Sequence, residues 1–225
     1  MGGLLVARAG VAEEELSLTQ CAFLFSLSRR GSPFSAVGIR REACVLSAAV
    51  SELVLAGVFL PQPETRFAFS GKEPPEYLAP LCTELRPGES QEWEPFLDSL
   101  LFSVCRSPVL TALNVSLGES LCRLGFVGRE SQRSQVLFPP CRLALDSAAG
   151  ALRTQLGGRT ELSRENGILC YLLNATGLWN RLFSRSDLVL ARRQVPNLDG
   201  MIPGRVLRMI DRLDCALPGE TFCAC

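Results

Sequence analysis

The chain has 225 residues, of which 47% are hydrophobic and 20% are charged, a balance typical of a folded globular domain rather than of a disordered chain. Its 23 basic and 23 acidic side chains cancel, so net charge gives no general attraction to nucleic acid or to anionic membranes. The absence of histidine excludes His-dependent triads, imidazole general bases and the commonest metal ligand.

The charge is unevenly distributed along the chain. Residues 61–105 carry three basic and eight acidic side chains, whereas residues 106–225 carry fifteen basic and ten acidic ones. An anionic ligand is therefore expected to bind the second half. No uncharged run reaches the ~20 residues that a membrane-spanning helix needs, and the apolar stretch at the N-terminus is too short for a secretory signal. These features predict a cytoplasmic location.

Five of the ten cysteines fall within apolar helical patterns, where they are expected to be small, buried, reduced hydrophobes. This group is Cys21, Cys44, Cys105, Cys122 and Cys170. Three others, Cys215, Cys223 and Cys225, cluster at the C-terminus and are interpreted as incidental, with a thiol metal site or a disulfide as the alternative. No cofactor and no metal site are predicted.

Helical periodicity dominates the chain. Apolar residues recur at helical spacing in residues 16–27, 41–56, 93–104, 109–124, 139–156, 161–183, 186–193 and 203–213. Ser17 has the chemistry of an N-cap for the first of these helices. A connection rich in proline and glutamate, residues 70–92, is expected to be a surface loop with a short helix near Tyr77–Cys82.

Two of these helices are followed by a glycine and then by a short hairpin. The first hairpin is predicted at Val58–Leu60 and Phe67–Phe69, and the second at Phe126–Val127 and Val136–Phe138, with a polar turn over residues 128–134. The predicted fold is mainly α, a single compact helical bundle with one or two short β-hairpins. Residues 1–15 are expected to form an N-terminal lead, residues 16–195 the helical domain, and residues 196–225 a C-terminal helix and Cys-containing tail.

No motif for catalysis stands out. The sequence contains no Gly-x-Ser-x-Gly elbow, no P-loop and no strand-linked Gly-x-Gly-x-x-Gly, so it predicts a binding protein without catalytic residues. Arginine forks suit phosphate because they donate two parallel hydrogen bonds. The candidate lipid- or phosphate-binding residues are Arg29, Arg40, Arg129, Arg133 and Arg142. Scattered surface arginine is the alternative interpretation.

Four blocks of the sequence follow one another in a familiar order. They are Leu16–Leu27, Ala48–Phe59, Leu121–Val127 with Val136–Phe138, and Gly167–Phe183. Together they resemble the Golgi phosphoprotein 3 family and its bacterial relatives. The resemblance implies an all-helical core with a protruding β-hairpin and, from the eukaryotic members, binding of phosphatidylinositol 4-phosphate on a membrane surface.

The family's headgroup residues are not matched here. Its tryptophan and arginines correspond to Val37, Leu46, Thr111 and Asn114, none of which can form a charged fork. We therefore expect a non-enzymatic peripheral membrane or adaptor-type binding protein, with headgroup recognition in question. Its partner would be an anionic membrane lipid or a membrane-bound protein. Because a helix followed by a hairpin occurs twice, a winged-helix-like nucleic-acid-binding or protein-interaction module is the alternative, although the zero net charge and single lysine speak against nucleic acid.

Overall fold

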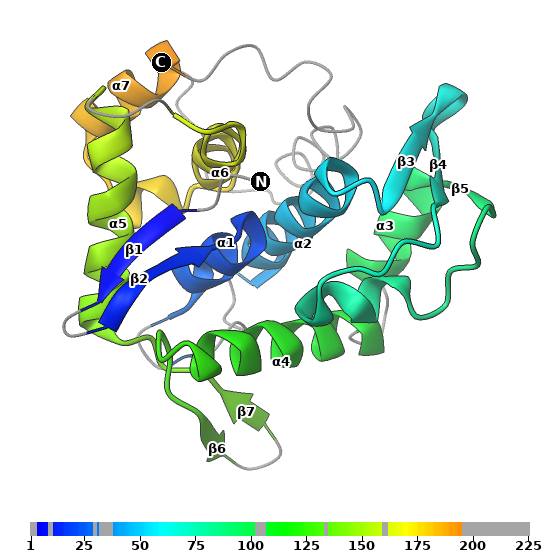
Figure 1. Cartoon of the computed structure of the whole chain (residues 1–225), viewed down its shortest axis with the longest axis horizontal. Helices are drawn as coiled ribbons and strands as arrows, with labels where there is room; N and C mark the ends of the chain where they lie inside the picture. Colours follow the sequence, from blue (N-terminus) through cyan, green and yellow to red (C-terminus); the bar gives the residue numbers. More distant parts are fainter. Residues whose placement is uncertain are drawn as a thin grey trace.

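A computed structural model describes residues 4–8, 11–28, 31, 38–101, 107–132, 135–158 and 162–194. Over these residues the chain is mainly helical and carries small antiparallel sheets, as Figure 1 shows. The predicted fold class is confirmed.

The described helices lie close to the predicted ones. They are α1 (Leu18–Ser26), α2 (Gly38–Leu55), α3 (Trp93–Leu101), α4 (Pro108–Arg123), α5 (Arg142–Leu156), α6 (Arg164–Ala175) and α7 (Arg185–Gln194). Short 3-10 turns are η1 (Pro63–Thr65), η2 (Glu76–Cys82) and η3 (Trp179–Arg181). None of the helices in this part of the chain has the length and apolar character to cross a membrane.

Helix α1 is the centre of the bundle. Every one of its residues is buried, and it packs against α2, α4, α5 and α6 (Figure 1). Its start is fixed by a reciprocal cap, in which the Gln20 N–H donates to Ser17 Oγ at 3.3 Å and the Ser17 N–H donates to Gln20 Oε1 at 3.0 Å. The predicted N-cap at Ser17 is confirmed, and the cap satisfies two N–H groups that a helix start leaves open.

The first hairpin forms as predicted and gains a third strand. β3 (Phe59–Gln62) and β4 (Arg66–Phe69) pair antiparallel, and β5 (Ser90–Glu92), from the predicted loop, joins β4. The sheet packs on α3 through aromatic rings, with Phe67 and Trp93 stacked at 4.1 Å between centroids. β5 is short and polar, so it lacks the alternation that reveals a half-buried strand.

The second hairpin forms further along the chain than predicted. β6 (Glu130–Gln132) and β7 (Gln135–Leu137) are its strands, so β6 lies within the expected polar turn and the strand prediction at Phe126–Val127 was wrong. Both of those residues are buried, and Val127 makes only an isolated bridge with Pro140. The apolar pair belongs to the core, while the polar strands beyond it are held by backbone pairing that side-chain pattern does not reveal.

The long helix predicted over residues 161–183 ends at Ala175. The Thr176 hydroxyl donates to the Leu172 carbonyl at 2.7 Å, and Gly177 adopts φ 71°, a left-handed conformation that ends helices. The chain then makes η3, which seats Trp179 in the core. The apolar residues on both sides of this break keep helical spacing in the sequence, so their pattern does not reveal where the helix ends.

The N-terminal segment contributes to the packed structure. β1 (Leu4–Arg8) and β2 (Val11–Leu16) form a hairpin in which Leu4 and Leu16 are paired and buried. The hairpin packs on α5 (Figure 1), and the predicted boundary after residue 15 falls inside β2. The predicted helix at residues 203–213 and the C-terminal cysteines lie outside the described residues.

Candidate functional site

The root of the second hairpin is built by backbone hydrogen bonds between its two arms. The Gly128 N–H donates to the Pro139 carbonyl at 2.8 Å, and the Cys141 N–H donates to the Phe126 carbonyl at 2.9 Å. The connection after α1 joins this root, because the Phe138 N–H donates to the Gly31 carbonyl at 3.1 Å. The root is therefore a fixed platform at the ends of α4 and α5.

Two of the predicted arginines flank this root, one on each arm. Arg129 follows Gly128, and Arg142 is the first residue of α5. With the neighbouring Leu143 they define what we call the hairpin-root surface: Arg129, Arg142 and Leu143.

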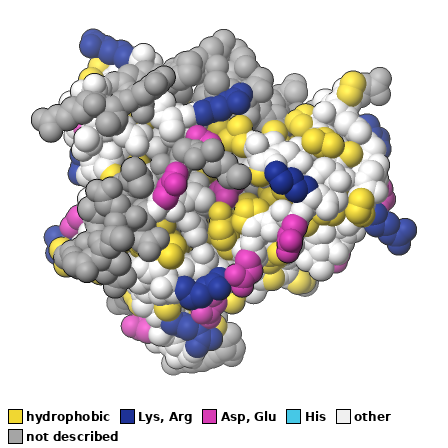
Figure 2. Space-filling view, in the orientation of Figure 1, with side chains coloured by type: hydrophobic (Ala, Val, Ile, Leu, Met, Phe, Trp, Pro, Cys, Tyr) yellow, Lys and Arg dark blue, Asp and Glu magenta, His cyan; other side chains and the backbone are white. Residues whose placement is uncertain are grey.

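Arg129 is already balanced by an acid. Its Nε lies 2.6 Å from Glu119 Oε1 on α4, and its side chain is 51% exposed. A second pair, Arg123 Nη2 with Glu76 Oε2 at 3.0 Å, lies further along the same helix. Acidic and basic side chains accordingly mix over α4 (Figure 2), and this helix offers no field of one sign.

Arg142 and Leu143 are far more exposed. The Arg142 side chain is 93% exposed, and its Nε lies 3.9 Å from Asp146 Oδ2. An ion pair this long between exposed side chains contributes little stability. Leu143 is 75% exposed, because the buried face of α5 is formed by Ala144, Ala148, Ala149, Leu152 and Leu156. An apolar side chain thus stands in solvent beside a cation.

Of the remaining predicted arginines, the structure describes Arg40, which does not extend this surface. Arg40 lies half-buried in the first turn of α2, on a different element, and Arg29 and Arg133 lie outside the described residues. The predictions for Arg29 and Arg133 therefore remain predictions.

The positions that correspond to the family's headgroup residues do not form a polar site. Leu46 and Asn114 are buried and Thr111 is exposed, while Val37 lies outside the described residues. The sequence prediction passed over Arg41 as a site residue; this arginine is buried and is discussed below.

Buried thiols are poor candidates for chemistry. Burial raises the pKa of Cys44 and of Cys170 to about 12, and the thiolate is the reactive form. Cys21, Cys44 and Cys170 are buried as predicted and Cys122 is partly so, whereas Cys105 lies outside the described residues. Within the described ranges no group of three or more Cys, Asp or Glu side chains is arranged to hold a metal ion.

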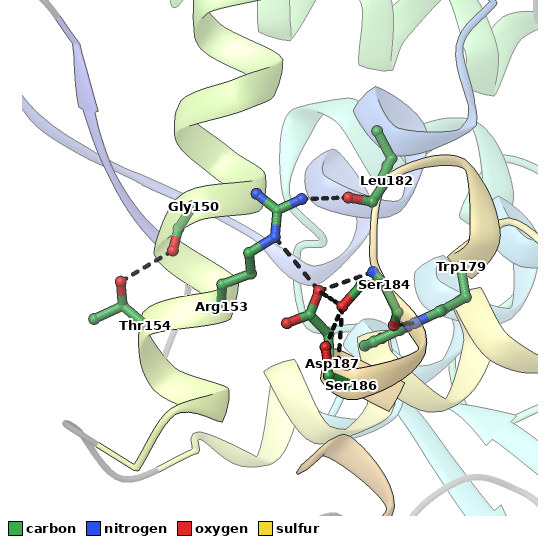
Figure 3. A network of polar contacts seen from close by, with 8 residues as sticks. All are labelled: Gly150, Arg153, Thr154, Trp179, Leu182, Ser184, Ser186 and Asp187. Atoms are coloured by element: carbon green, nitrogen blue, oxygen red, sulfur yellow. Dashed lines mark hydrogen bonds and ion pairs between the residues drawn. The ribbon is translucent and has the colours of Figure 1, made fainter. Parts of the chain in front are cut away.

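A denser polar network joins α5 to α7 (Figure 3). Asp187 Oδ2 accepts from the Ser184 N–H and the Ser184 hydroxyl, each at 2.8 Å, and lies 3.6 Å from Arg153 Nε. Partial burial opposes ionisation of Asp187, but the hydrogen bonds from Ser184 and the charge of Arg153 hold its pKa below the ordinary value. A carboxylate of lowered pKa is a weak base. The contacts of Ser184, Asp187 and Arg153 cap α7 and tie it to α5.

Comparison with known proteins adds no identification. No protein-family model matches the sequence, and no curated protein is significantly similar to it.

Proposed function

We propose that this protein is a non-enzymatic peripheral binding protein that docks on an anionic membrane through the hairpin-root surface. The observation that carries the proposal is the pairing of an exposed leucine, Leu143, with an exposed arginine, Arg142, at the start of a rigid helix. A single exposed leucine is ordinary on a protein surface. Leu143 lies beside Arg142, whose ion pair with Asp146 is long. Together the two side chains match the apolar interior and the anionic headgroup layer of a membrane.

The contact is expected to be weak and reversible. A basic side chain near an anionic membrane contributes about 1 kcal/mol, and full burial of a leucine contributes about 1.5–3 kcal/mol. Arg129 contributes less because Glu119 neutralises it. Stable residence on a membrane therefore requires a second signal, such as a membrane-bound partner or a specific headgroup.

The experiment is flotation of the full chain with vesicles of phosphatidylcholine, alone or mixed with phosphatidylserine or with phosphatidylinositol 4-phosphate. The last mixture addresses the lipid that the family resemblance implies. The wild-type protein should float with anionic vesicles and not with neutral ones. Leu143→Ser and Arg142→Gln should each lower its partition coefficient, the leucine change by about tenfold or more, given the transfer energy of its side chain.

Val189→Ser is the matched control, because Val189 is 50% exposed but lies on α7, away from the hairpin-root surface. It should float like the wild type. Equal recovery with neutral and anionic vesicles, or full recovery of both surface variants, would refute the proposal.

The alternative, a winged-helix-like nucleic-acid binder, has less support. Of the arginines around the second hairpin, Arg123 and Arg129 are each held by a glutamate within hydrogen-bonding distance. Nucleic acid would have to displace these acids, and strong binding normally depends on a uniformly basic face. A mobility-shift titration at low salt without retardation would remove this alternative.

A further inference from the structure

The first turn of α2 contains an arginine, Arg41, for which the described residues supply no hydrogen-bond partner at two of its three nitrogens. Arg41 is only 8% exposed, and its Nε and Nη1 atoms are buried without a hydrogen-bond partner. A guanidinium group cannot lose its proton at any ordinary pH, so it cannot escape this environment by becoming neutral. A buried unpaired charge is strongly unfavourable, which means that an acceptor has to come from elsewhere.

A second arginine stands close to the first. Arg181, at the end of η3, donates from Nη2 to the Leu27 carbonyl at 3.3 Å, which holds its side chain across the end of α1. Burial, followed by the nearby charge of Arg181, lowers the pKa of Arg41. Among the described residues, neither arginine has a carboxylate partner. The positive charge of Arg181 therefore acts on the positive charge of Arg41.

We infer that Arg41 and Arg181 form a binding site for a phosphate monoester dianion. A phosphate monoester carries about −1.5 to −2 charges near pH 7 and three strong acceptor oxygens, which match two guanidinium forks. A carboxylate would bring one charge to two cations and leave one of them uncompensated. The site contains no residue of the hairpin-root surface, so the inference does not rest on the proposed function.

The two arginines differ in their exposure to solvent. Arg181 is exposed, whereas Arg41 is buried. Arg181 is expected to affect affinity, and Arg41 to affect both affinity and the stability of the empty protein.

The test is thermal unfolding of the full chain in inorganic phosphate, compared with sodium chloride of equal ionic strength. Phosphate should raise Tm progressively with concentration, because a ligand that binds only the folded state stabilises it by mass action. Arg41→Met should remove this response while leaving Tm in chloride equal to or above that of the wild type, since it also removes a buried unpaired cation. Arg181→Gln should weaken the response.

Arg185→Gln is the matched control, because Arg185 is an exposed arginine four residues further along the chain. It should respond to phosphate like the wild type. If phosphate and chloride give the same Tm for the wild type, or if Arg41→Met retains the full response, the inference is overturned. Should Arg41→Met fail to fold, the Arg41 Nε–H signal in nuclear magnetic resonance of the wild type decides: it must shift with phosphate and not with chloride.

Two further arms identify the source of the phosphate group. Glycerol 3-phosphate represents a soluble monoester, and vesicles containing phosphatidic acid represent a lipid one. A Tm increase with glycerol 3-phosphate that Arg41→Met abolishes assigns the site to a soluble ligand. Flotation with phosphatidic acid that Arg41→Met abolishes, and that Leu143→Ser leaves measurable, assigns it to a lipid. If both Leu143→Ser and Arg142→Gln leave flotation with anionic vesicles unchanged, the proposed function is refuted and this inference stands.

Discussion

The ring of Phe138 lies directly against the backbone of Gly118, where a Cβ atom would stand 2.3 Å from both Cδ2 and Cε2 of that ring. Gly118 is within α4, and Phe138 follows β7 on the returning arm of the second hairpin. Phe138 is 1% exposed. The missing side chain therefore creates the space in which the hairpin arm is anchored to the helix.

Gly118→Ala should destabilise the protein even though alanine is the better helix former. The substitution gains about 1 kcal/mol in helix propensity, but it forces a buried ring out of place, and overpacking costs about 1–3 kcal/mol or more. Urea denaturation should show a lower midpoint than for the wild type.

Gly150→Ala in α5 is the control for this prediction, because a Cβ there would have no neighbouring atom within 4 Å. It should raise the midpoint, by up to about 1 kcal/mol. Unchanged or increased stability of Gly118→Ala would contradict the contact with Phe138.

Tyr77 and Glu52 connect η2 to the core. Glu52, 9% exposed, accepts from the Tyr77 hydroxyl at 2.6 Å and from the Thr19 N–H and hydroxyl at 2.9 and 2.7 Å. Tyr77→Phe should lower the free energy of unfolding by about 1.5–3 kcal/mol, the usual contribution of a hydrogen bond to a charged group. Urea denaturation measures the loss.

The same contact predicts a dependence on alkaline pH. Burial, and then the charge of Glu52, raises the pKa of the Tyr77 phenol above its ordinary value. The folded protein therefore holds this proton more tightly than the unfolded chain, and its contribution is complete below about pH 10 and lost as pH rises further. Absorbance of phenolate should appear late for one of the two tyrosines, and Tyr77→Phe should remove that late titration.

The thiols should react in the order of their exposure. Cys141 is exposed, whereas burial raises the pKa of Cys82 to about 11 and of Cys44 to about 12. Iodoacetamide followed by mass spectrometry should modify Cys141 first and the two buried thiols only after unfolding. Because these raised values favour the protonated folded state, stability should also fall as pH rises above about 9, where thiols of the unfolded chain ionise.

Ser184→Ala should weaken the start of α7. The Ser184 hydroxyl accepts from the Asp187 N–H at 3.2 Å and donates to its carboxylate, so the substitution should cost about 0.5–2 kcal/mol, as for other N-caps. Since the pKa of Asp187 is lowered in the folded protein, its contribution is present above about pH 4 and is lost as pH falls further. Asp187→Asn should flatten that acid dependence, as measured by unfolding at several pH values.

Periodicity was sufficient to predict most of the helices. Helix α1 carries apolar residues on every side and a serine with a glutamine three residues later, and both the helix and its cap follow from these local features. The first hairpin was equally visible because its apolar residues belong to the strands themselves. In the second hairpin the buried residues, Phe126 and Val127, precede the strands, so the same pattern gave the wrong register.

The candidate sites were only partly predictable. Arginine chemistry selected both Arg129 and Arg142 as candidates. The structure distinguishes them because Glu119 on α4 pairs with Arg129, a contact between α4 and the hairpin that the sequence does not reveal. The pairing of Arg41 with Arg181 joins residues on α2 and η3, and no sequence spacing relates them. Burial of Arg41 is likewise a tertiary property, since the helix pattern alone places it at an ordinary polar position.

The N-terminal hairpin has a consequence for how the protein is made. Leu4 and Leu16 precede α5, the helix on which their hairpin packs, by more than a hundred residues, so they are synthesised well before it. The apolar face of the β1–β2 hairpin therefore stays uncovered while the helices between β2 and α5 are translated. Exposed hydrophobic segments can aggregate or bind chaperones during this interval. The same segment of the sequence carries Glu13, Glu14 and Glu15. Negative charges next to an exposed apolar segment reduce its aggregation.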